Sequence, residues 1–295
     1  QVSSARRHNL QYTMQRRPRD PMPLVLAALK ESRGAALIYA RTRRSVEAWA
    51  ERLQGQNVSA TPYHAGLDPQ TRQQALKLFL EEERPVLVAT VAFGMGVDRG
   101  DVGLVLHLDL PATPEGYLQE SGRAGRDGNP AHCLVLFSPG DRTSLGWAMQ
   151  ASARNGGTMD DQRRLDLAQQ QLRRMEAVAE GEMCREQALL LAVGELVDPC
   201  GRCDRCVALP KRRDWTPQVE TLLTHLADQN GTDIRRLGEH LALHEPGRQD
   251  RWTWLARRLV QEELIQESND GAQRLYLRDS GRRYLDSPWP LDYAA

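Results

Sequence analysis

Two short segments of this chain carry side chains suited to binding phosphate groups and a metal ion. The first, residues 119–128, reads QESGRAGRDG. In a helix, Gln119, Arg123 and Arg126 would lie at i, i+4 and i+7 and share one face. A guanidinium group is planar, stays charged at any working pH and fits phosphate oxygens. Gly122 and Gly125 weaken a helix, so they favour close backbone approach instead. A solvated arginine surface has a similar composition, so the segment alone allows both interpretations.

The second segment is a cluster of cysteines in a chain that is otherwise poor in cysteine. Four of the five cysteines follow the pattern C-x15-C-x2-C-x2-C, namely Cys184, Cys200, Cys203 and Cys206. Four closely spaced thiolates fit a tetrahedral zinc site, and they leave no open position for catalysis. We therefore expect one structural zinc and a reducing compartment, and we prefer this to a disulfide framework. Arg202 and Arg205 are expected to offset the thiolate charge, and Cys133 to be a small buried residue.

The chain has no phosphate-binding loop of the GxxxxGK[ST] kind. Its three lysines, Lys30, Lys77 and Lys211, all follow a residue other than glycine, so the required Gly-Lys pair is absent. Arginines suited to phosphates therefore occur without a loop that would hold a nucleotide. We expect the chain to be one part of a larger protein or complex. Its start at Gln1 instead of Met fits a fragment.

Composition places the chain among ordinary globular proteins with two or three domains. It has 295 residues, 40% hydrophobic and 26% charged, with a formal net charge of zero. The balanced charge gives no global electrostatic argument for nucleic acid, so any such argument must come from local arrangement. No apolar run approaches the roughly 20 residues of a membrane span, and no signal peptide is recognisable. We expect a cytoplasmic protein without a membrane partner.

Short apolar runs alternate with helical patterns between residues 34 and 137, which predicts an α/β fold with a parallel sheet. Asp68 before Pro69 and Thr113 before Pro114 predict sharply started helices. Five strands are predicted, at Ala35 to Ala40, Val58 to Tyr63, Pro85 to Thr90, Val102 to Leu108 and Ala131 to Phe137.

A helical region follows over residues 144–193, with Gly156 and Gly157 as its expected break. From Asp214 onward the pattern predicts three short helices and then a hairpin with a turn at residues 269–271, which together describe a winged helix. The predicted domains are a parallel-sheet lobe over residues 1–143, a helical zinc-binding module over residues 144–213, and a winged-helix domain over residues 214–295.

Four segments in this order resemble a known family. IYARTR, YHAGL, VATVAFGMGVD and QESGRAGRDG are similar to the second motor lobe of a superfamily-two helicase, and AFGMG with QESGRAGRDG resembles the RecQ family in particular. The cysteine spacing ahead of a winged helix also resembles the RecQ zinc module, so the resemblance extends over most of the chain. It implies a RecA-like lobe that closes on ATP and Mg²⁺ held by a first lobe, which is absent from this sequence.

The resemblance also implies roles for individual residues. Arg126 would be the arginine finger, with Arg123 at the same γ-phosphate and Gln119 coupling the nucleotide to lobe closure. Asp98, in the loop that contains Gly94 and Gly96, would face the ribose. Thr90 and the loop around His64 would touch one DNA strand. Both arginines should face an open surface in this chain.

The winged helix commonly places its third helix or its wing against duplex DNA. The candidate contacts are Arg248, Arg251, Arg257, Arg258 and Arg274. The region from residue 214 has four more acidic than basic residues, and winged helices also bind proteins, so a protein contact is the alternative. Tyr276 lies inside a predicted strand and is expected to be packed.

The sequence therefore favours the C-terminal part of an ATP-dependent DNA helicase, with 3′ to 5′ polarity implied by the resemblance alone. Such an enzyme would act in DNA repair or recombination, associated with the nucleoid. The chain by itself should not hydrolyse ATP. The alternative is a non-enzymatic DNA-binding or regulatory protein derived from such a helicase.

Overall fold

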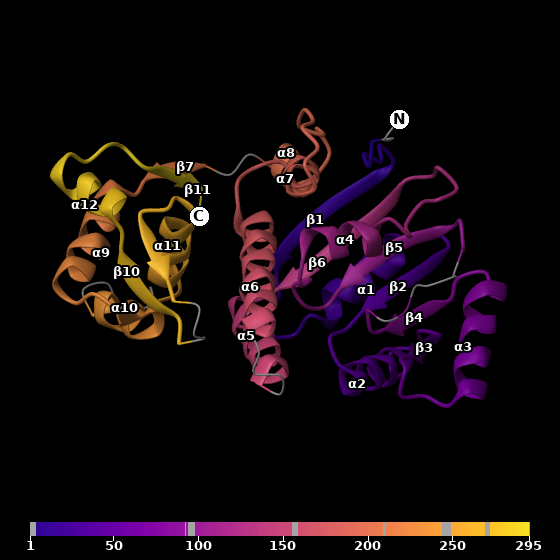
Figure 1. Cartoon of the computed structure of the whole chain (residues 1–295). Helices are drawn as coiled ribbons and strands as arrows, with labels where there is room; N and C mark the ends of the chain where they lie inside the picture. Colours follow the sequence, from indigo (N-terminus) through magenta and orange to yellow (C-terminus); the bar gives the residue numbers. More distant parts are fainter. Residues whose placement is uncertain are drawn as a thin grey trace. The chain divides into compact units, whose positions relative to one another are not determined.

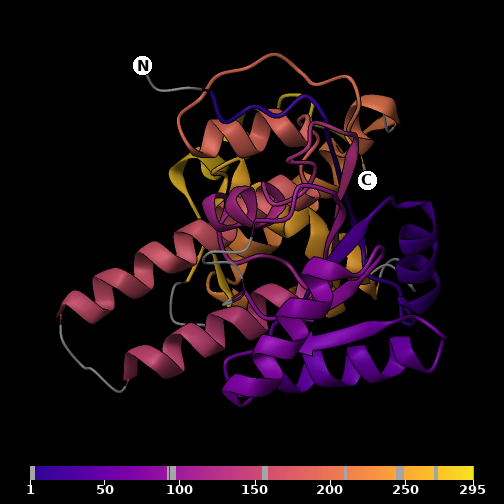
Figure 2. The ribbon, with the colours of Figure 1, turned by 90° about the vertical axis from the view of Figure 1, so that its right-hand side faces the viewer.

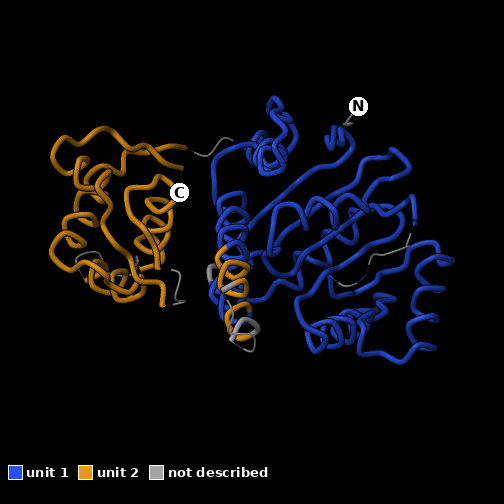
Figure 3. Tube along the Cα trace, in the orientation of Figure 1, with its two compact units in different colours: residues 1–148, 167–209 blue, residues 149–166, 210–295 orange. Residues whose placement is uncertain are grey.

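The structure is a computed structural model, and it divides the chain into two compact units that are described separately. Unit 1 comprises residues 1–148 and 167–209, and unit 2 comprises residues 149–166 and 210–295 (Figure 3). The residues described are 4–91, 93, 98–154, 159–208, 211–243, 249–268 and 272–294. The domain limits expected at residues 143 and 213 stay a prediction.

Unit 1 contains a six-stranded sheet in which every neighbouring pair of strands is parallel, with strand order β1-β6-β5-β2-β4-β3 (Figure 1). The predicted α/β fold with a parallel sheet is confirmed. The strands are β1 (Leu10–Arg16), β2 (Ala35–Tyr39), β3 (Ala60–Tyr63), β4 (Val86–Ala89), β5 (Val102–His107) and β6 (Ala131–Phe137). The accompanying helices are α1 (Met22–Glu31), α2 (Arg43–Gln54), α3 (Pro69–Glu81) and α4 (Pro114–Ser121).

Strand burial explains which strands the sequence revealed. β2 and β4 are buried at every residue, because helices cover both faces of a parallel sheet. All five predicted strands are present, some shorter at their ends. β1 was missed: only Leu10, Tyr12 and Met14 are buried, alternating with more exposed neighbours. That period-two pattern is typical of a strand that is covered less completely, and β1 lies at the edge of the sheet.

Side-chain caps start the helices where the sequence predicted. The Asp68 carboxylate accepts a hydrogen bond from the Thr71 backbone N–H at 2.9 Å, ahead of Pro69. The Thr113 hydroxyl accepts one from Gly116 N–H at 2.9 Å, ahead of Pro114. Each cap satisfies an N–H that has no partner within the helix. The two caps therefore fix where the connections between strands turn into helices.

A helical segment follows the sheet. Its elements are α5 (Pro139–Arg154), α6 (Met159–Glu180), α7 (Arg185–Ala192) and the short α8 (Asp204–Val207). Figure 2 shows α5 and α6 as two long helices, and an Arg142 to Glu176 ion pair at 3.1 Å joins them. The break expected at Gly156 and Gly157 lies outside the described residues. Among the described residues, none of the helices combines the length and apolar character of a membrane span.

Unit 2 contains the three predicted helices, α9 (Thr216–Asp228), α10 (Ile234–Ala242) and α11 (Gln249–Gln261). An antiparallel sheet of order β8-β10-β9 follows, made of Thr232–Asp233, Arg274–Leu277 and Ile265–Glu267. α12 (Asp279–Asp286) and the pair β7 (Arg212–Asp214) and β11 (Asp292–Ala294) complete the unit. Apolar faces of the helices form its core, including Leu222, Leu237 and Leu255. The winged-helix assignment stays a prediction, and the turn at residues 269–271 lies outside the described residues.

Candidate functional site

Residues 119–128 do not form one continuous helix. The helical face that Gln119, Arg123 and Arg126 would share is therefore not formed. α4 ends at Ser121, and Gly122 to Asp127 form successive turns. Gly125 has φ +55°, and a Cβ there would lie 2.4 Å from Asn9 Nδ2. Its N–H donates to Val102 O at 2.9 Å. Gly125 therefore serves close backbone approach, which presses this loop against the start of β5.

The structure brings Arg126 and Asp98 together from two different loops. Arg126 Nη1 donates to Asp98 Oδ1 at 2.6 Å, and these side chains are 36% and 84% exposed. Asp127 N–H donates to Gly100 O at 3.2 Å and ties the two loops together beside this pair. Both side chains are accessible, as expected for Arg126. Gly94 and Gly96, expected in the same loop as Asp98, lie outside the described residues.

Arg123 is placed differently from Arg126, because it is half-buried beside Tyr39. The expectation that both arginines face an open surface therefore holds for Arg126 only. Burial raises the pKa of the Tyr39 phenol, while the charge and hydrogen bond of Arg123 lower it. The Tyr39 hydroxyl also donates to Phe93 O at 3.4 Å. Tyr39 thus links the end of β2, the loop after β4 and the arginine loop. Gln119 is exposed on α4.

The buried residue His107 contacts Tyr39 and Glu120 at this junction, and the sequence analysis did not identify it. His107, 2% exposed at the end of β5, stacks on Tyr39 with ring centroids 4.8 Å apart. Its Nε2 lies 2.7 Å from Glu120 Oε2 on α4. The only sequence signal was a histidine at the carboxyl end of a buried strand. Together these contacts fix the last turn of α4, from which the arginine loop departs.

His64 and Thr90 lie at the carboxyl ends of β3 and β4. His64 is 3% exposed, with Nε2 3.0 Å from Glu47 Oε1 and Nδ1 accepting the Gly66 N–H at 3.2 Å. Both ring nitrogens have partners inside the protein, so the side chain fixes the shape of this loop. The DNA contact expected of the loop around His64 stays a prediction. Thr90 is half-buried, and its N–H donates to Tyr63 O at 3.3 Å.

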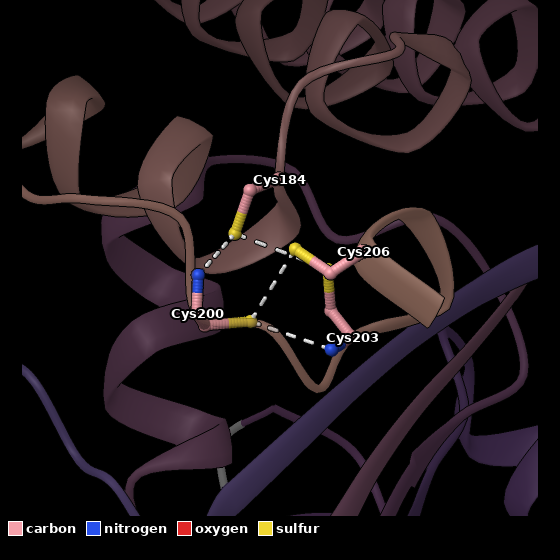
Figure 4. A group of neighbouring side chains, drawn as sticks. All are labelled: Cys184, Cys200, Cys203 and Cys206. Atoms are coloured by element: carbon pink, nitrogen blue, oxygen red, sulfur yellow. Dashed lines mark hydrogen bonds between the residues drawn. The ribbon is translucent and has the colours of Figure 1, made fainter. Parts of the chain in front are cut away.

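The four clustered cysteines converge on one point, as Figure 4 shows. Their sulfur atoms all lie within 4.8 Å of one another. Cys203 Sγ is 3.9 Å from Cys184 Sγ, and Cys200 Sγ is 4.0 Å from Cys206 Sγ. Tetrahedral zinc with bonds of about 2.3 Å requires sulfur separations of about 3.8 Å. The donor set and its spacing therefore fit a structural zinc ion.

Backbone N–H groups point at these sulfur atoms and favour their thiolate form. Cys200 N–H donates to Cys184 Sγ at 3.2 Å, and Cys203 N–H donates to Cys200 Sγ at 3.3 Å. Burial raises the pKa of Cys184, Cys200 and Cys206, whereas at Cys203 hydrogen bonds from the Arg185 and Cys206 backbones outweigh burial and lower the pKa. Burial in β6 also raises the pKa of Cys133, to about 12, as expected for a buried residue outside the cluster.

Arg185, next to the first ligand, connects the cysteine cluster to the sheet and was not singled out from sequence. It is 1% exposed, and its Nε and Nη2 donate to the Asp204 carboxylate at 3.0 and 2.9 Å. Its Nη1 donates to the carbonyls of Val178 and Gly181, and its Nη2 to Met14 O at 3.5 Å. One guanidinium therefore joins α6, α8 and β1.

Arg202 forms a second connection between the cluster and the sheet. Its Nε donates to Leu10 O at 2.8 Å, and its Nη2 contacts Glu186 Oε1 at 2.5 Å. Arg6 pairs with the same Glu186 carboxylate at 3.1 Å, so the role expected of Arg202 in offsetting thiolate charge stays a prediction. The cysteine cluster is thus fastened to the edge strand through arginine side chains.

We expect Arg185→Ala and Asp204→Asn each to lower the free energy of unfolding by about 3 kcal/mol. The first leaves the carbonyls of Val178, Gly181 and Met14 without their donor, and the second leaves the buried Arg185 charge without its carboxylate. Urea denaturation of both single variants and the double variant would measure this, and the double variant should cost less than the sum. Glu81→Gln, which removes an exposed pair with Lys77 at 3.9 Å, is the control and should cost about 0.5 kcal/mol or less. Additive single effects would contradict a direct Arg185 to Asp204 interaction.

In unit 2, most candidate arginines on α11 are already engaged. Arg257 is buried, at 7% exposed, and its expected DNA contact stays a prediction. Arg258 lies 4.9 Å from the Tyr293 ring centroid and 3.0 Å from Glu262. Arg251 lies 5.8 Å from the Trp215 ring centroid. Arg274 is exposed on β10, and Arg248 lies outside the described residues.

Comparison with known proteins adds two family matches. Residues 21–128 match the family described as helicase conserved C-terminal domain, and residues 139–207 match the family described as RecQ zinc-binding. The second match contains all four clustered cysteines.

Three curated relatives carry the name ATP-dependent DNA helicase RecQ. The Haemophilus influenzae protein is 29% identical over 99% of this chain and 50% of its own length. The Pasteurella multocida protein is 32% identical over 82% of this chain and 36% of its own. The Bacillus subtilis protein is 35% identical over 64% of this chain and 31% of its own. The chain thus spans half or less of the length of these relatives.

Proposed function

The chain belongs to the RecQ helicase family, and we propose that it acts as the C-terminal part of an ATP-dependent DNA helicase. The observation that carries this proposal is the accessible Arg126 beside Asp98, in a sequence that contains no phosphate-binding loop. An arginine so placed can complete a nucleotide site whose other half lies on a different lobe. The non-enzymatic alternative is not favoured, since the matched relatives are named as helicases.

In this proposal Arg126 stabilises the negative charge that develops on the γ-phosphate during hydrolysis. A positioned guanidinium of this kind contributes about 10³ to 10⁵ in kcat in phosphoryl transfer. Without nucleotide, Arg126 is held by Asp98 at 2.6 Å. Because both side chains are exposed, that ion pair is weak, and a phosphate group can replace Asp98 as the partner of Arg126. Asp98 is then available to the ribose hydroxyls.

Arg123 and Gln119 act next to the finger. Arg123 contacts Tyr39, which bonds Phe93 in the loop after β4, so a shift of the arginine loop is transmitted to that loop. Gln119 is exposed one turn before the finger loop and is our candidate for sensing the nucleotide. Mg²⁺ bound by the first lobe would neutralise the phosphate charge, because this sequence offers no Walker-type site for the ion.

We propose that one DNA strand passes over the carboxyl ends of β3 and β4, where Thr90 lies, and that unit 2 contacts DNA as a winged helix. The polarity, 3′ to 5′, follows from the family resemblance, as do a role in repair or recombination and an association with the nucleoid. Zinc has a structural role in this proposal. It holds the segment from Cys184 to Cys206 in one conformation, and Arg185 and Arg202 connect that segment to β1.

The test compares this 295-residue chain with the complete protein that contains the upstream sequence. We expect the complete protein to hydrolyse ATP when single-stranded DNA is added, and to displace a strand from a duplex with a 3′ tail. The chain alone should bind DNA without ATP turnover, because it cannot hold the β and γ phosphates. ATP turnover by the chain alone, or a complete protein without DNA-stimulated turnover, would contradict the proposal.

A further inference from the structure

The outer face of β10 carries an aromatic residue between two arginines. Burial alternates along the strand: Leu275 and Leu277 point into the core, whereas Arg274 and Tyr276 are exposed. Arg278, next in this alternation, has a side chain that is 45% exposed. Successive side chains on one face of a strand are about 7 Å apart, so the arginines lie on either side of the tyrosine ring.

The ring of Tyr276 packs against the backbone at Gly231. A Cβ built at Gly231, whose φ is +84°, would come within 3.2 Å of Tyr276 Cε1, so the ring rests against the backbone there. The residue nevertheless stays 38% exposed. Tyr276 is therefore packed on one side, as expected, and its other side is accessible. Its neighbour across the strand pair is Gln266, which is also exposed and leaves the ring without an aromatic partner in register.

The acidic groups near this face leave the arginines accessible to phosphate. Asp233 lies opposite Arg274 in register, but its carboxylate accepts the backbone N–H groups of Arg235 and Arg236 at the start of α10. Arg278 Nη1 is 3.7 Å from Glu263 Oε2, and both side chains are exposed. An ion pair of that length in water is weak, so a phosphate group can displace it.

We propose that this face binds an unpaired DNA strand: Tyr276 stacks on one base, and Arg274 and Arg278 pair with the flanking phosphates. An exposed ring can stack only on a base whose own face is open, which excludes the interior of a duplex and favours a single strand. The α11 arginines are less suited to this task, since Arg257 is buried and Arg258 is engaged by Tyr293 and Glu262. The choice of DNA as the ligand rests on the proposed function.

The test measures binding of the 295-residue chain to fluorescein-labelled single-stranded and blunt duplex DNA of equal length, across a salt series. We expect Tyr276→Ala to weaken binding to the single strand about tenfold and to leave duplex binding within about twofold, whereas Tyr276→Phe retains affinity. Removing both arginines should reduce the magnitude of the salt slope for the single strand by about 1.4, because two phosphate contacts are lost.

The matched control is the double variant Lys30→Ala, Lys77→Ala, which removes two exposed charges on α1 and α3 and should leave the binding and its salt slope unchanged. Thermal unfolding checks that each variant is folded. Tyr276→Leu, which keeps an apolar contact with Gly231, replaces Tyr276→Ala if the latter unfolds. Unchanged single-strand affinity in folded Tyr276 variants, or an equal loss on duplex DNA, would overturn the proposal. Either result would leave the ATPase test untouched.

Discussion

Arg126→Ala in the complete protein is expected to lower kcat for ATP hydrolysis by about 10³ to 10⁵, while binding to single-stranded DNA stays within about twofold. The reason is geometric. The loop from Gly122 to Asp127 is pinned by Gly125 N–H to Val102 O and by Asp127 N–H to Gly100 O, so it presents Arg126 on a fixed support. Steady-state ATPase assays and fluorescence anisotropy measure the two quantities separately.

Two further variants sharpen this experiment. Arg126→Lys keeps the positive charge but loses the planar fork, so we expect it to recover only a small part of the lost kcat. Arg52→Ala is the matched control, because Arg52 is 48% exposed and forms its own surface ion pair with Asp20 at 3.3 Å. It should leave kcat unchanged. Arg126→Ala with undiminished turnover would eliminate Arg126 as the arginine finger.

Cys203→Ser is expected to abolish zinc binding and to unfold the segment from Cys184 to Cys206. Cys203 is a fully buried member of the cluster, and structural zinc sites contribute folding energy outright. Metal analysis should fall from about one zinc per chain to nearly none. Limited proteolysis should then cut this segment faster than it does in the unmodified chain.

Cys133→Ala is the control for the zinc experiment. Cys133 is equally buried, but it lies in β6 and its thiol contacts Ser121 O at 3.7 Å, outside the cluster. The variant should retain its zinc and its resistance to proteolysis. If the unmodified chain carried four free thiols without metal, the structural site would be disproved. Zinc retained by Cys203→Ser would instead remove Cys203 from the ligand set.

Local patterns in the sequence were sufficient for the central strands and for the zinc site. Apolar runs such as Ala35 to Ala40 report burial on both faces, and caps such as Asp68 before Pro69 act within one turn of helix. Three of the four cysteine ligands lie within seven residues, so their convergence is also largely a local property. In each case the physical cause lies within a few positions of the pattern.

The tertiary structure decided which polar side chains meet and which are accessible. Asp98 and Arg126 are 28 residues apart, and Arg185 reaches Met14 across 171 residues, so no local period reports either contact. The same holds for burial: Arg257 and His64 are as polar as Arg126, yet packing encloses them and leaves Arg126 exposed. Sequence by itself thus determined the central strands, the capped helices and the cysteine donor set. Only the packing of distant segments determined the arginine loop, its partner Asp98 and the accessible face of β10, because those depend on long-range contacts.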